Sequence, residues 1–397
     1  MRTAAQAATD IHGILTSMGT RFAALCLALT LGVACGGGED EPGRYSELLW
    51  LVPDTDAFHA GVTVVDYEAI RALPGYQASR PAGQTDEELA GDPLAFRKAL
   101  GWHGMVGAPL GILSFEDQYF SDGVAILEEG FGISLGAIDR TLAAGVAPPR
   151  YLYATAGSFD PDAIEARAAT CEDCVPGERR DYRGEPYLTW GGEMALDKRM
   201  APPAFDELGR GGHFVFTDDY VIRSNFLQDF EASIDASLGE GSLLNDDAYR
   251  LASEELDRHE LVGLFISTQG YGSEHAQNMA DQLSENDTLE RFARAWDVPA
   301  GERLRAFQLF AVGAGLAGDE PFTLIVLVHP TEAAAQENVE RLNERLATGV
   351  AEADFPFASV FTSTEVTSSG RVLVATLRGE DRLGLALSSF EPLLLHE

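Results

Sequence analysis

The sequence predicts an α+β protein of tandem β-α-β-β-α modules, with antiparallel sheets covered by helices, after an N-terminal export signal. Residues 151–235 and 322–390 have the same predicted order of strand, helix, strand, strand, helix. Each module is expected to place its helices on one face of its sheet. Removing residues 1–34 from the 397 leaves 363, enough for two or three domains with their own cores.

The N-terminal stretch has the pattern of a secretion signal that ends in a cysteine. Arg21 precedes an apolar run at 22–31, and small residues follow up to Cys35. The run is shorter than the roughly 20 apolar residues that span a bilayer, so a signal-peptide core fits its length. A buried hydrophobic helix of a cytosolic protein is the alternative. Met18 would supply a normal start, which makes 1–17 an over-extended beginning of the chain.

The stretch around Cys35 resembles the lipobox of bacterial lipoproteins, in which the chain is cut before the cysteine and the cysteine carries lipid. The family usually has leucine three residues before the cysteine; here Gly32 stands there, with Leu31 one position further away. The resemblance implies a signal peptide over 1–34, lipidation at Cys35 and membrane contact through that lipid. Gly36 after the cysteine resembles lipoproteins passed to the outer membrane. The expected location is therefore the cell envelope, at the periplasmic or surface face.

The charge of the folded part excludes some partners. Without Arg2, Arg21 and Asp10, 26 of the 28 basic residues face 62 of the 63 acidic ones, a net charge of −36. Such a surface repels nucleic acid and anionic lipid head groups. An electrostatic partner would be cationic, such as a basic envelope protein, a polycation or a divalent metal ion. Simple solubility of a secreted protein is the alternative interpretation.

The four cysteines divide by position. Cys26 leaves with the signal and Cys35 is the lipidation candidate, so Cys171 and Cys174 remain, in the order CEDC. An exported compartment oxidises paired thiols, which predicts a local structural disulfide. A redox-active pair is the alternative, but the two acids between the thiols and the predicted helix before them disfavour a thiolate. Zinc is disfavoured because no second cysteine pair or close histidine pair completes four ligands.

The mature chain is expected to begin with the lipidated cysteine and a flexible acidic, glycine-rich tether at 35–44, followed by an N-terminal α/β region at 45–149. As a random coil, the tether GGGEDEPG would reach about 15 Å. The elements predicted in the region are an apolar helix or strand at 47–53, a strand at 61–67, a short helix stopped by Pro74-Gly75, a helix at 86–100 that Pro93 interrupts, and a short helix at 138–144.

The first α+β module is expected at 150–300. Asp160 and Pro161 open a helix as N-cap and first helical residue, and Asn225 is the expected cap of another. The predicted elements are a strand at 151–157, a helix through 163–169, a turn at Arg183-Gly184 before a strand ending at 190, a hairpin at 213–224, helices at 226–235 and 246–259, a strand at 261–268, and one or two helices at 274–296.

The second α+β module is expected at 301–397. Its clearest element is a helix that begins at Pro330-Thr331, presents an apolar stripe and ends at Gly349. The stripe consists of Ala335, Val339, Leu342 and Leu346. The other predicted elements are strands at 307–316 and 322–328, a hairpin of 358–366 with 371–379, and a helix at 381–395.

The order and composition of residues 151–397 also resemble uncharacterised bacterial lipoproteins with tandem modules of this kind. Generic features carry this resemblance, such as FDPDAI at 159–164 and YRG at 182–184. It implies no reaction, so any activity has to be argued from individual residues.

One motif suggests an enzyme. Residues 132–136 read G-I-S-L-G, the G-x-S-x-G pattern of the α/β-hydrolase nucleophile elbow, with Ser134 as nucleophile. His329, just after an apolar strand, would be the histidine, and many acids could complete a triad. The elbow needs a strand directly before it and a helix behind it, but the residues EEG at 128–130 are poor buried strand. Ser134 is more simply the N-cap of a helix toward Asp139-Arg140.

The remaining candidates have structural interpretations. They are His259-Glu260, the histidines at 103, 213 and 275, the glycine-rich turn at 209–212, and the aspartate pairs 54/56 and 160/162. The histidines are expected at the surface or at strand edges, and no zincin spacing is present. The turn lacks the Lys-Ser/Thr of a phosphate loop, and the aspartates lack the glycine and distal glutamate of an EF-hand. We therefore expect no metal site and no cofactor.

Together these observations predict a lipid-anchored, exported cell-envelope protein of unknown specific role, acting as a non-catalytic binding or structural protein. Two other classes remain open. One is a secreted serine hydrolase that uses Ser134. The other is a thiol-redox or metal protein that uses Cys171 and Cys174.

Overall fold

The computed structural model describes residues 43–78, 83–92, 131–145, 150–169, 177–191, 193, 211–270, 272, 298–318, 320–350, 356–379 and 393–397. The chain divides into two units, residues 1–43 and residues 44–397. The elements below all belong to the second unit, which begins one residue before the predicted start of the folded part. Within the described residues, none of the helices has the length and apolar character needed to cross a bilayer.

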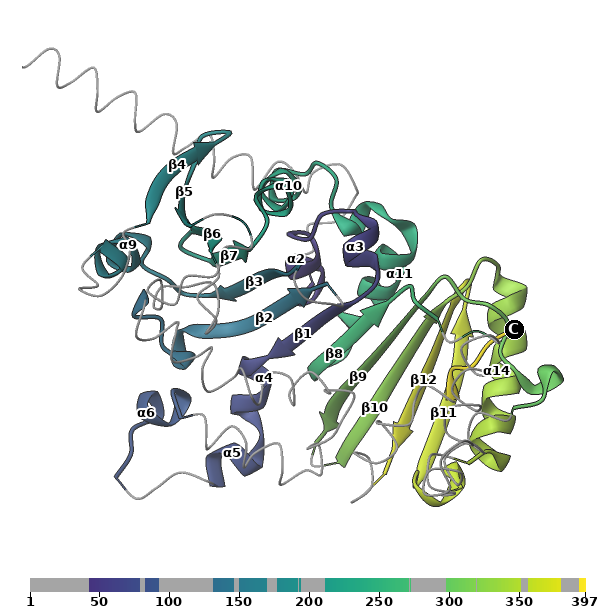
Figure 1. The fold of residues 1–397 in the computed structure, drawn as a ribbon. Coiled ribbons are helices and arrows are strands. Elements are labelled where there is room, and N and C mark those ends of the chain that lie inside the picture. The colour runs from purple at the N-terminus through teal and green to yellow at the C-terminus, as the bar shows by residue number, and fades with distance from the viewer. Residues whose placement is uncertain are drawn as a thin grey trace, which may run out of the picture. The chain divides into compact units, whose positions relative to one another are not determined.

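Twelve strands form one sheet in which every neighbouring pair is antiparallel (Figure 1). This agrees with the predicted α+β class. The order across the sheet is β11-β12-β10-β9-β8-β1-β2-β3-β7-β6-β5-β4. The strands are β1 Val62–Asp66, β2 Ile138–Ala144, β3 Leu152–Gly157, β4 Glu178–Tyr182, β5 Glu185–Trp190, β6 Gly212–Phe216, β7 Tyr220–Ser224, β8 Leu261–Ser267, β9 Leu309–Ala317, β10 Glu320–Val328, β11 Ser363–Ser369 and β12 Val372–Arg378.

The sheet consists of two halves that meet where β1 pairs with β8. From that centre one half runs β1-β2-β3-β7-β6-β5-β4 and the other runs β8-β9-β10-β12-β11. The sheet continues across both predicted module boundaries, because β2 pairs with β3 and β8 pairs with β9. The described strands therefore join in one sheet, whereas the sequence predicted a sheet for each module.

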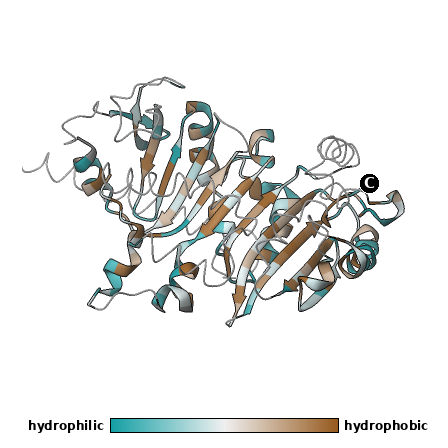
Figure 2. Ribbon diagram, turned by 60° about the horizontal axis from the view of Figure 1, so that its bottom comes forward, coloured by the Kyte–Doolittle hydropathy of each residue, from teal (hydrophilic) through white to brown (hydrophobic). Residues whose placement is uncertain are grey.

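Helices cover both faces of the sheet, which corrects the prediction that they lie on one face. The first seven residues of β9 are all buried. Phe310 and Val312 belong to one hydrophobic cluster, and Leu309 and Ala311 belong to a second one. A strand buried on both sides requires a covering layer on each. Figure 2 shows hydrophobic residues along the central strands, as this arrangement requires.

The two faces are named here after their principal helices, α14 and α11. On the α14 face lie α4 Tyr67–Ala72, α5 Pro74–Ala78, α6 Asp86–Ala90, α9 Pro161–Ala169 and α14 Glu332–Thr348. On the α11 face lie α2 Ser46–Leu49, α3 Asp56–His59, α10 Leu227–Ser237 and α11 Asp247–Leu256. Single 3₁₀ turns are formed by Leu135–Ala137, Leu243–Asn245, Ala300–Glu302 and Phe357–Ser359.

Several local predictions are confirmed. The β4–β5 hairpin turns at Arg183 and Gly184, whose φ angles of 55° and 92° lie in the left-handed region that favours glycine. Asp160 caps α9, since its carboxylate accepts the N–H of Ala163 at 3.0 Å. Thr331 caps α14 in the same way. These signals act over three or four residues, which is why the sequence reveals them.

Two predictions are wrong for reasons of tertiary structure. Residues 138–144 form β2 rather than a helix, because the backbone of β2 pairs with both β1 and β3. A helix there would leave two central strands with unpaired polar groups inside the protein. Asn225 does not cap α10, whose N-cap is Phe226. The side-chain oxygen of Asn225 instead accepts the N–H of Tyr151 at 3.1 Å and joins the start of β3 to the end of β7.

Other predicted helical segments lie outside the described residues. They are residues 93–100, 274–296 and most of 381–395.

Packing in the sheet is close around Gly315 of β9. A Cβ atom there would lie 2.4 Å from the carbonyl oxygen of Glu260 and 2.6 Å from Cζ of Phe322. We therefore expect Gly315→Ala to lower the free energy of unfolding by about 1–3 kcal/mol, measured by urea unfolding. Gly301→Ala is the control, since no described atom lies within 4 Å of its Cβ position. Equal unfolding midpoints for the two variants would contradict this packing.

Candidate functional site

Some predicted site residues lie outside the described part of the chain. They are Cys35, Cys171, Cys174, His103, His275 and the first two residues of the turn at 209–212. Lipidation at Cys35 and a disulfide between Cys171 and Cys174 therefore stay predictions, as does any thiol chemistry of that pair.

Ser134 does not lie in a nucleophile elbow. It is exposed and precedes the 3₁₀ turn Leu135–Ala137, which leads directly into β2. The motif is therefore followed by one turn and a strand, whereas an elbow is followed by a helix. Ser134 does stand at an N-cap position, but its side chain makes no capping bond.

His329 is fully buried just beyond β10, where both ring nitrogens have partners. Nε2 lies 2.7 Å from Nδ2 of Asn338, and Nδ1 lies 3.3 Å from the carbonyl oxygen of Arg371. Because an amide nitrogen only donates, Nε2 accepts this bond and the ring proton is assigned to Nδ1. Burial lowers the pKa of His329, which favours the neutral ring. This histidine joins the start of β12 to α14.

The fold keeps Ser134 and His329 apart. Ser134 precedes the end of β2 that pairs with Asp66, whereas His329 follows the opposite end of β10. Four strand spacings of about 4.8 Å also separate β2 from β10. The described residues therefore do not bring together the serine and histidine that acyl transfer needs.

The other described histidines make structural contacts. Their polar partners are His59–Asp54 at 2.6 Å, His213–Thr189 at 2.9 Å, His259–Glu255 at 3.2 Å and, for His396, the carbonyl oxygen of Glu397 at 2.9 Å. His213 is buried in β6 with its ring centroid 5.7 Å from that of Phe230, which corrects the prediction of a surface or strand-edge position. Within the described residues, no group of three or more His, Cys, Asp or Glu side chains could hold a metal ion.

A more informative site is the segment Arg44–Glu47, which we name the root because the N-terminal residues join the folded unit there. Tyr45 is fully buried. Its hydroxyl donates to the carbonyl oxygen of Leu261 at 3.0 Å and accepts the N–H of Leu261 at 2.9 Å. The backbone N–H of Tyr45 donates to Asp257 at 2.6 Å, and the Ser46 hydroxyl binds the same carboxylate. The root is thereby attached to the first residue of β8.

Ionic contacts attach the root to the other half of the sheet. Arg44 pairs with Asp66 at the end of β1, with 3.1 Å between nitrogen and oxygen. Glu47 pairs with Arg140 of β2 at 2.9 Å and accepts a hydrogen bond from the Tyr220 hydroxyl of β7. Arg140 also donates to the carbonyl oxygen of Arg44 at 2.8 Å. The root thus contacts β1, β2, β7 and β8, strands of both halves.

Burial controls the ionisation of the groups around the root. Asp66 is fully buried, and one of its carboxylate oxygens accepts the N–H of Ala69 at 2.7 Å as the N-cap of α4. Burial raises the pKa of Asp66, and the Ala69 N–H opposes this shift. Burial also raises the pKa of Tyr45 and of Tyr220. Both phenols therefore remain protonated at neutral pH and can donate the hydrogen bonds described above.

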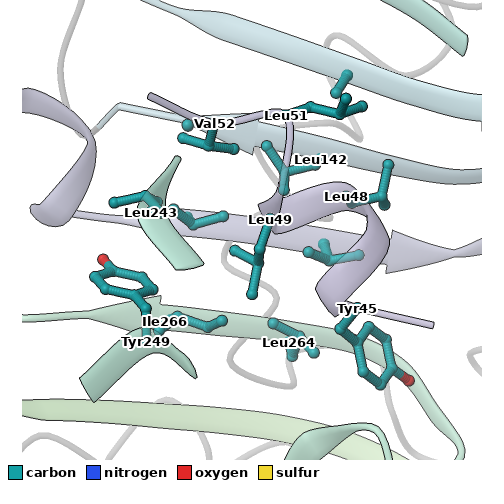
Figure 3. Packing of buried hydrophobic residues seen from close by; sticks show 14 of the residues in the cluster. Tyr45, Leu48, Leu49, Leu51, Val52, Leu142, Leu243, Tyr249, Leu264 and Ile266 are labelled. Atoms are coloured by element: carbon teal, nitrogen blue, oxygen red, sulfur yellow. The ribbon is translucent and has the colours of Figure 1, made fainter. Parts of the chain in front are cut away.

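Apolar packing continues from the root into the core. Leu48 and Leu49 of α2 are fully buried on the α11 face, in the same cluster as Leu142 of β2 and as Leu264 and Ile266 of β8 (Figure 3). Full burial of one leucine side chain contributes about 1.5–3 kcal/mol. The point at which the first 43 residues meet the folded unit is therefore part of its core.

Local sequence patterns indicate little of this site. Tyr45 and Leu261 are 216 residues apart, and Glu47 and Tyr220 are 173 apart, so no motif connects them. One usable signal is Asp66, an acid near the end of the predicted strand 61–67 and shortly before a predicted helix, where side chains often cap.

Comparisons with known proteins assign no family to the chain. No family model matches it, and no curated protein matches it. Similar solved structures are crystal forms I, III and IV of TP0453, with 9%, 8% and 8% identity and TM-scores of 0.33, 0.35 and 0.36. They cover 89%, 86% and 86% of this chain and 99%, 97% and 96% of the TP0453 chains. A likeness of this extent supports no conclusion about fold or function here.

The Tyr45 hydroxyl should contribute measurably to stability. Tyr45→Phe removes the partner of both the N–H and the carbonyl oxygen of Leu261 inside the protein. We expect it to lower the free energy of unfolding by about 1–3 kcal/mol in urea titrations. Tyr182→Phe is the matched control, because its hydroxyl binds Asp235 at 3.1 Å in a partly exposed hairpin. A loss no larger than that of the control would contradict the role given to Tyr45.

Asp66 should make stability depend on pH with a defined sign. Its pKa is raised in the folded state, so the folded protein holds this proton more tightly than the unfolded chain does. Stability contributed by Asp66 is therefore present below its ordinary pKa of about 3.9 and falls as pH rises above that value. As pH rises above about 3.9, wild type should lose stability relative to Asp66→Asn, measured by urea unfolding at a series of pH values.

Glu337 provides the control of opposite sign. Its hydrogen bond with Arg305 lowers the pKa of Glu337 to about 2. The stability it contributes is present above its ordinary pKa of about 4.3 and is lost as pH falls toward 2. Wild type should therefore lose stability relative to Glu337→Gln on acidification. A pH-independent difference between wild type and Asp66→Asn would refute the raised pKa of Asp66.

Proposed function

We propose that this protein is an exported lipoprotein of the cell envelope, anchored by lipid on Cys35, whose folded unit is a non-catalytic binding or structural surface. The observation that carries the proposal is that a glycine-rich, acidic stretch ends at residue 43 and a firmly bonded segment begins at Arg44. The tether at 36–43 has no large apolar residue, and the root that follows it is bonded to four strands. A flexible tether joined to a firmly held root suits a domain displayed at a membrane.

The position of the root supports this anchoring role. A pull through residue 43 acts on Arg44 and Tyr45, which bind β1 and β8 at the centre of the sheet. Central strands are paired on both edges, so they open at a higher free energy than edge strands. With a tether reach of about 15 Å, the domain would remain close to the lipid surface while keeping its orientation free.

The finer fold proposal is that the two halves of the sheet are tandem modules, with their boundary between β7 and β8 in place of the predicted boundaries at residues 150 and 301. In each half, a helix follows the third strand, α9 after β3 and α14 after β10, and both helices lie on the α14 face. In each half, a later strand returns to pair with that third strand, β7 with β3 and β12 with β10. The first module would carry β4 and β5 as an additional hairpin.

The remaining parts of the proposal follow from charge and compartment. Cys171 and Cys174 would form a local disulfide in an oxidising envelope. The net charge favours a basic envelope protein or another cationic ligand as partner and disfavours nucleic acid. We propose no hydrolase activity, because Ser134 and His329 lie far apart and the ring nitrogens of His329 are bonded elsewhere.

The intact mass of detergent-extracted protein from native membranes tests the anchor and the disulfide together. The expected chain begins at Cys35, carries added acyl mass and is two hydrogens lighter than the reduced form. Cys35→Ser should abolish the acyl mass and release the protein from the membrane fraction. Cys171→Ser should remove only the disulfide mass difference. An unlipidated chain that begins at Met1 or Met18, with free thiols, would overturn the proposal.

A further inference from the structure

The two edges of the sheet differ in their suitability for pairing with another strand. β4 at one edge reads ERRDY, so four of its five residues are charged. β11 at the other edge reads STEVTSS, with Glu365 as its one charged residue. β11 has no proline, glycine or lysine and pairs with β12 over all seven residues without a bulge. Charges, prolines and bulges are the usual devices that protect an edge, and β11 has one of them at a single position.

The pairing register shows which backbone groups of β11 point outward. The N–H of His329 donates to the carbonyl oxygen of Arg371 at 2.9 Å, so the backbone N–H and carbonyl groups of Arg371 point toward β10. Because these directions alternate along a strand, the backbone groups of every second residue from Val372 point toward β11. These residues are Val372, Val374, Thr376 and Arg378. The N–H of Thr362 donates to the carbonyl oxygen of Arg378 at 2.7 Å, which agrees with this phase.

In β11, the partners of those residues are Ser369, Thr367, Glu365 and Ser363. The intervening residues Thr364, Val366 and Ser368 therefore present their N–H and carbonyl groups to the outer edge. Among the described residues, no strand pairs with that edge.

We propose that β11 pairs antiparallel with β11 of a second copy of this chain, about a twofold axis at Val366. In that register Val366 faces Val366 of the second copy, and Thr364 faces Ser368 of the second copy. The three outward residues of each strand would form about six backbone hydrogen bonds across the axis. The two sheets would then continue as one through an isologous contact that closes after two copies.

Self-complementary charge favours a second copy as the occupant. Glu365 lies opposite Thr367 of the second copy, so no like charges face each other across the new pair. A β4 strand in the same place would bring four charged residues against hydroxyl side chains and would form an open-ended chain of copies. The net charge of −35 opposes association, and added salt screens that repulsion. The dimer should therefore strengthen as salt increases.

Sedimentation velocity over a range of concentrations tests the proposal. The full-length Cys35→Ser chain is used so that lipid does not drive association, which makes the result independent of the proposed anchor. This protein should dimerise, and more tightly at 0.5 M than at 0.05 M NaCl. Because Val366 lies on the axis, Val366→Pro removes two hydrogen bonds from the contact and should raise the dissociation constant about tenfold or more.

Three variants separate pairing from folding. Val366→Thr keeps the N–H and should still dimerise. Thr364→Pro also removes an outward N–H, at an exposed position, and should weaken the dimer while its circular dichroism stays that of the parent. Thr367→Pro removes an N–H that faces β12 and should destabilise the fold itself. A parent protein that is monomeric at every concentration and salt, or a folded Val366→Pro or Thr364→Pro variant that dimerises like the parent, would overturn the proposal.

Discussion

The pairing of β1 with β8 is the contact on which the rest of the sheet depends, because it joins the two halves. The ladder matches only four residue pairs, from Val62 with Ile266 to Val65 with Gly263. The root reinforces it from outside the ladder: Tyr45 binds the first residue of β8 and Arg44 binds the last residue of β1. Leu48 and Leu49 then cover the same strands with apolar surface. The segment 44–49 therefore acts as a third component of the centre of the sheet.

In this acidic protein, arginine side chains form many of the bonds between segments that are far apart in the sequence. Arg371 donates to the carbonyl oxygen of His329 and pairs with Asp247, which joins β12 to the start of α11. Arg345 of α14 is buried and donates to the carbonyl oxygens of Leu393, Leu395 and Glu302. With 28 basic and 63 acidic residues, this use of arginine leaves many carboxylates without a cation of their own. The surface keeps its negative field, which is the physical basis for expecting a cationic partner.

Sequence patterns predicted the elements whose signals are local. The Asp160 cap, the Arg183-Gly184 turn and the apolar stripe of α14 are examples, since each is complete within one turn or a few turns of chain. The strand β2 was missed because its conformation is imposed by two neighbouring strands. The single sheet and its two covered faces were missed for the same reason. The root could not be predicted because the partners of Tyr45 and Glu47 lie about half the chain away.

The charged edge strand β4 has a consequence for how large an assembly can become. Sheets that expose two receptive edges can add copies without limit, which is the geometry of fibrils. Here Glu178, Arg179, Arg180 and Asp181 make one edge unreceptive, so growth by strand addition has a single direction available to it. When β11 of one copy pairs with β11 of a second copy, both receptive edges are covered and no further copy can add. The stoichiometry is thereby limited by the chemistry of four charged residues at the far end of the sheet, and a high local concentration would produce pairs instead of polymers.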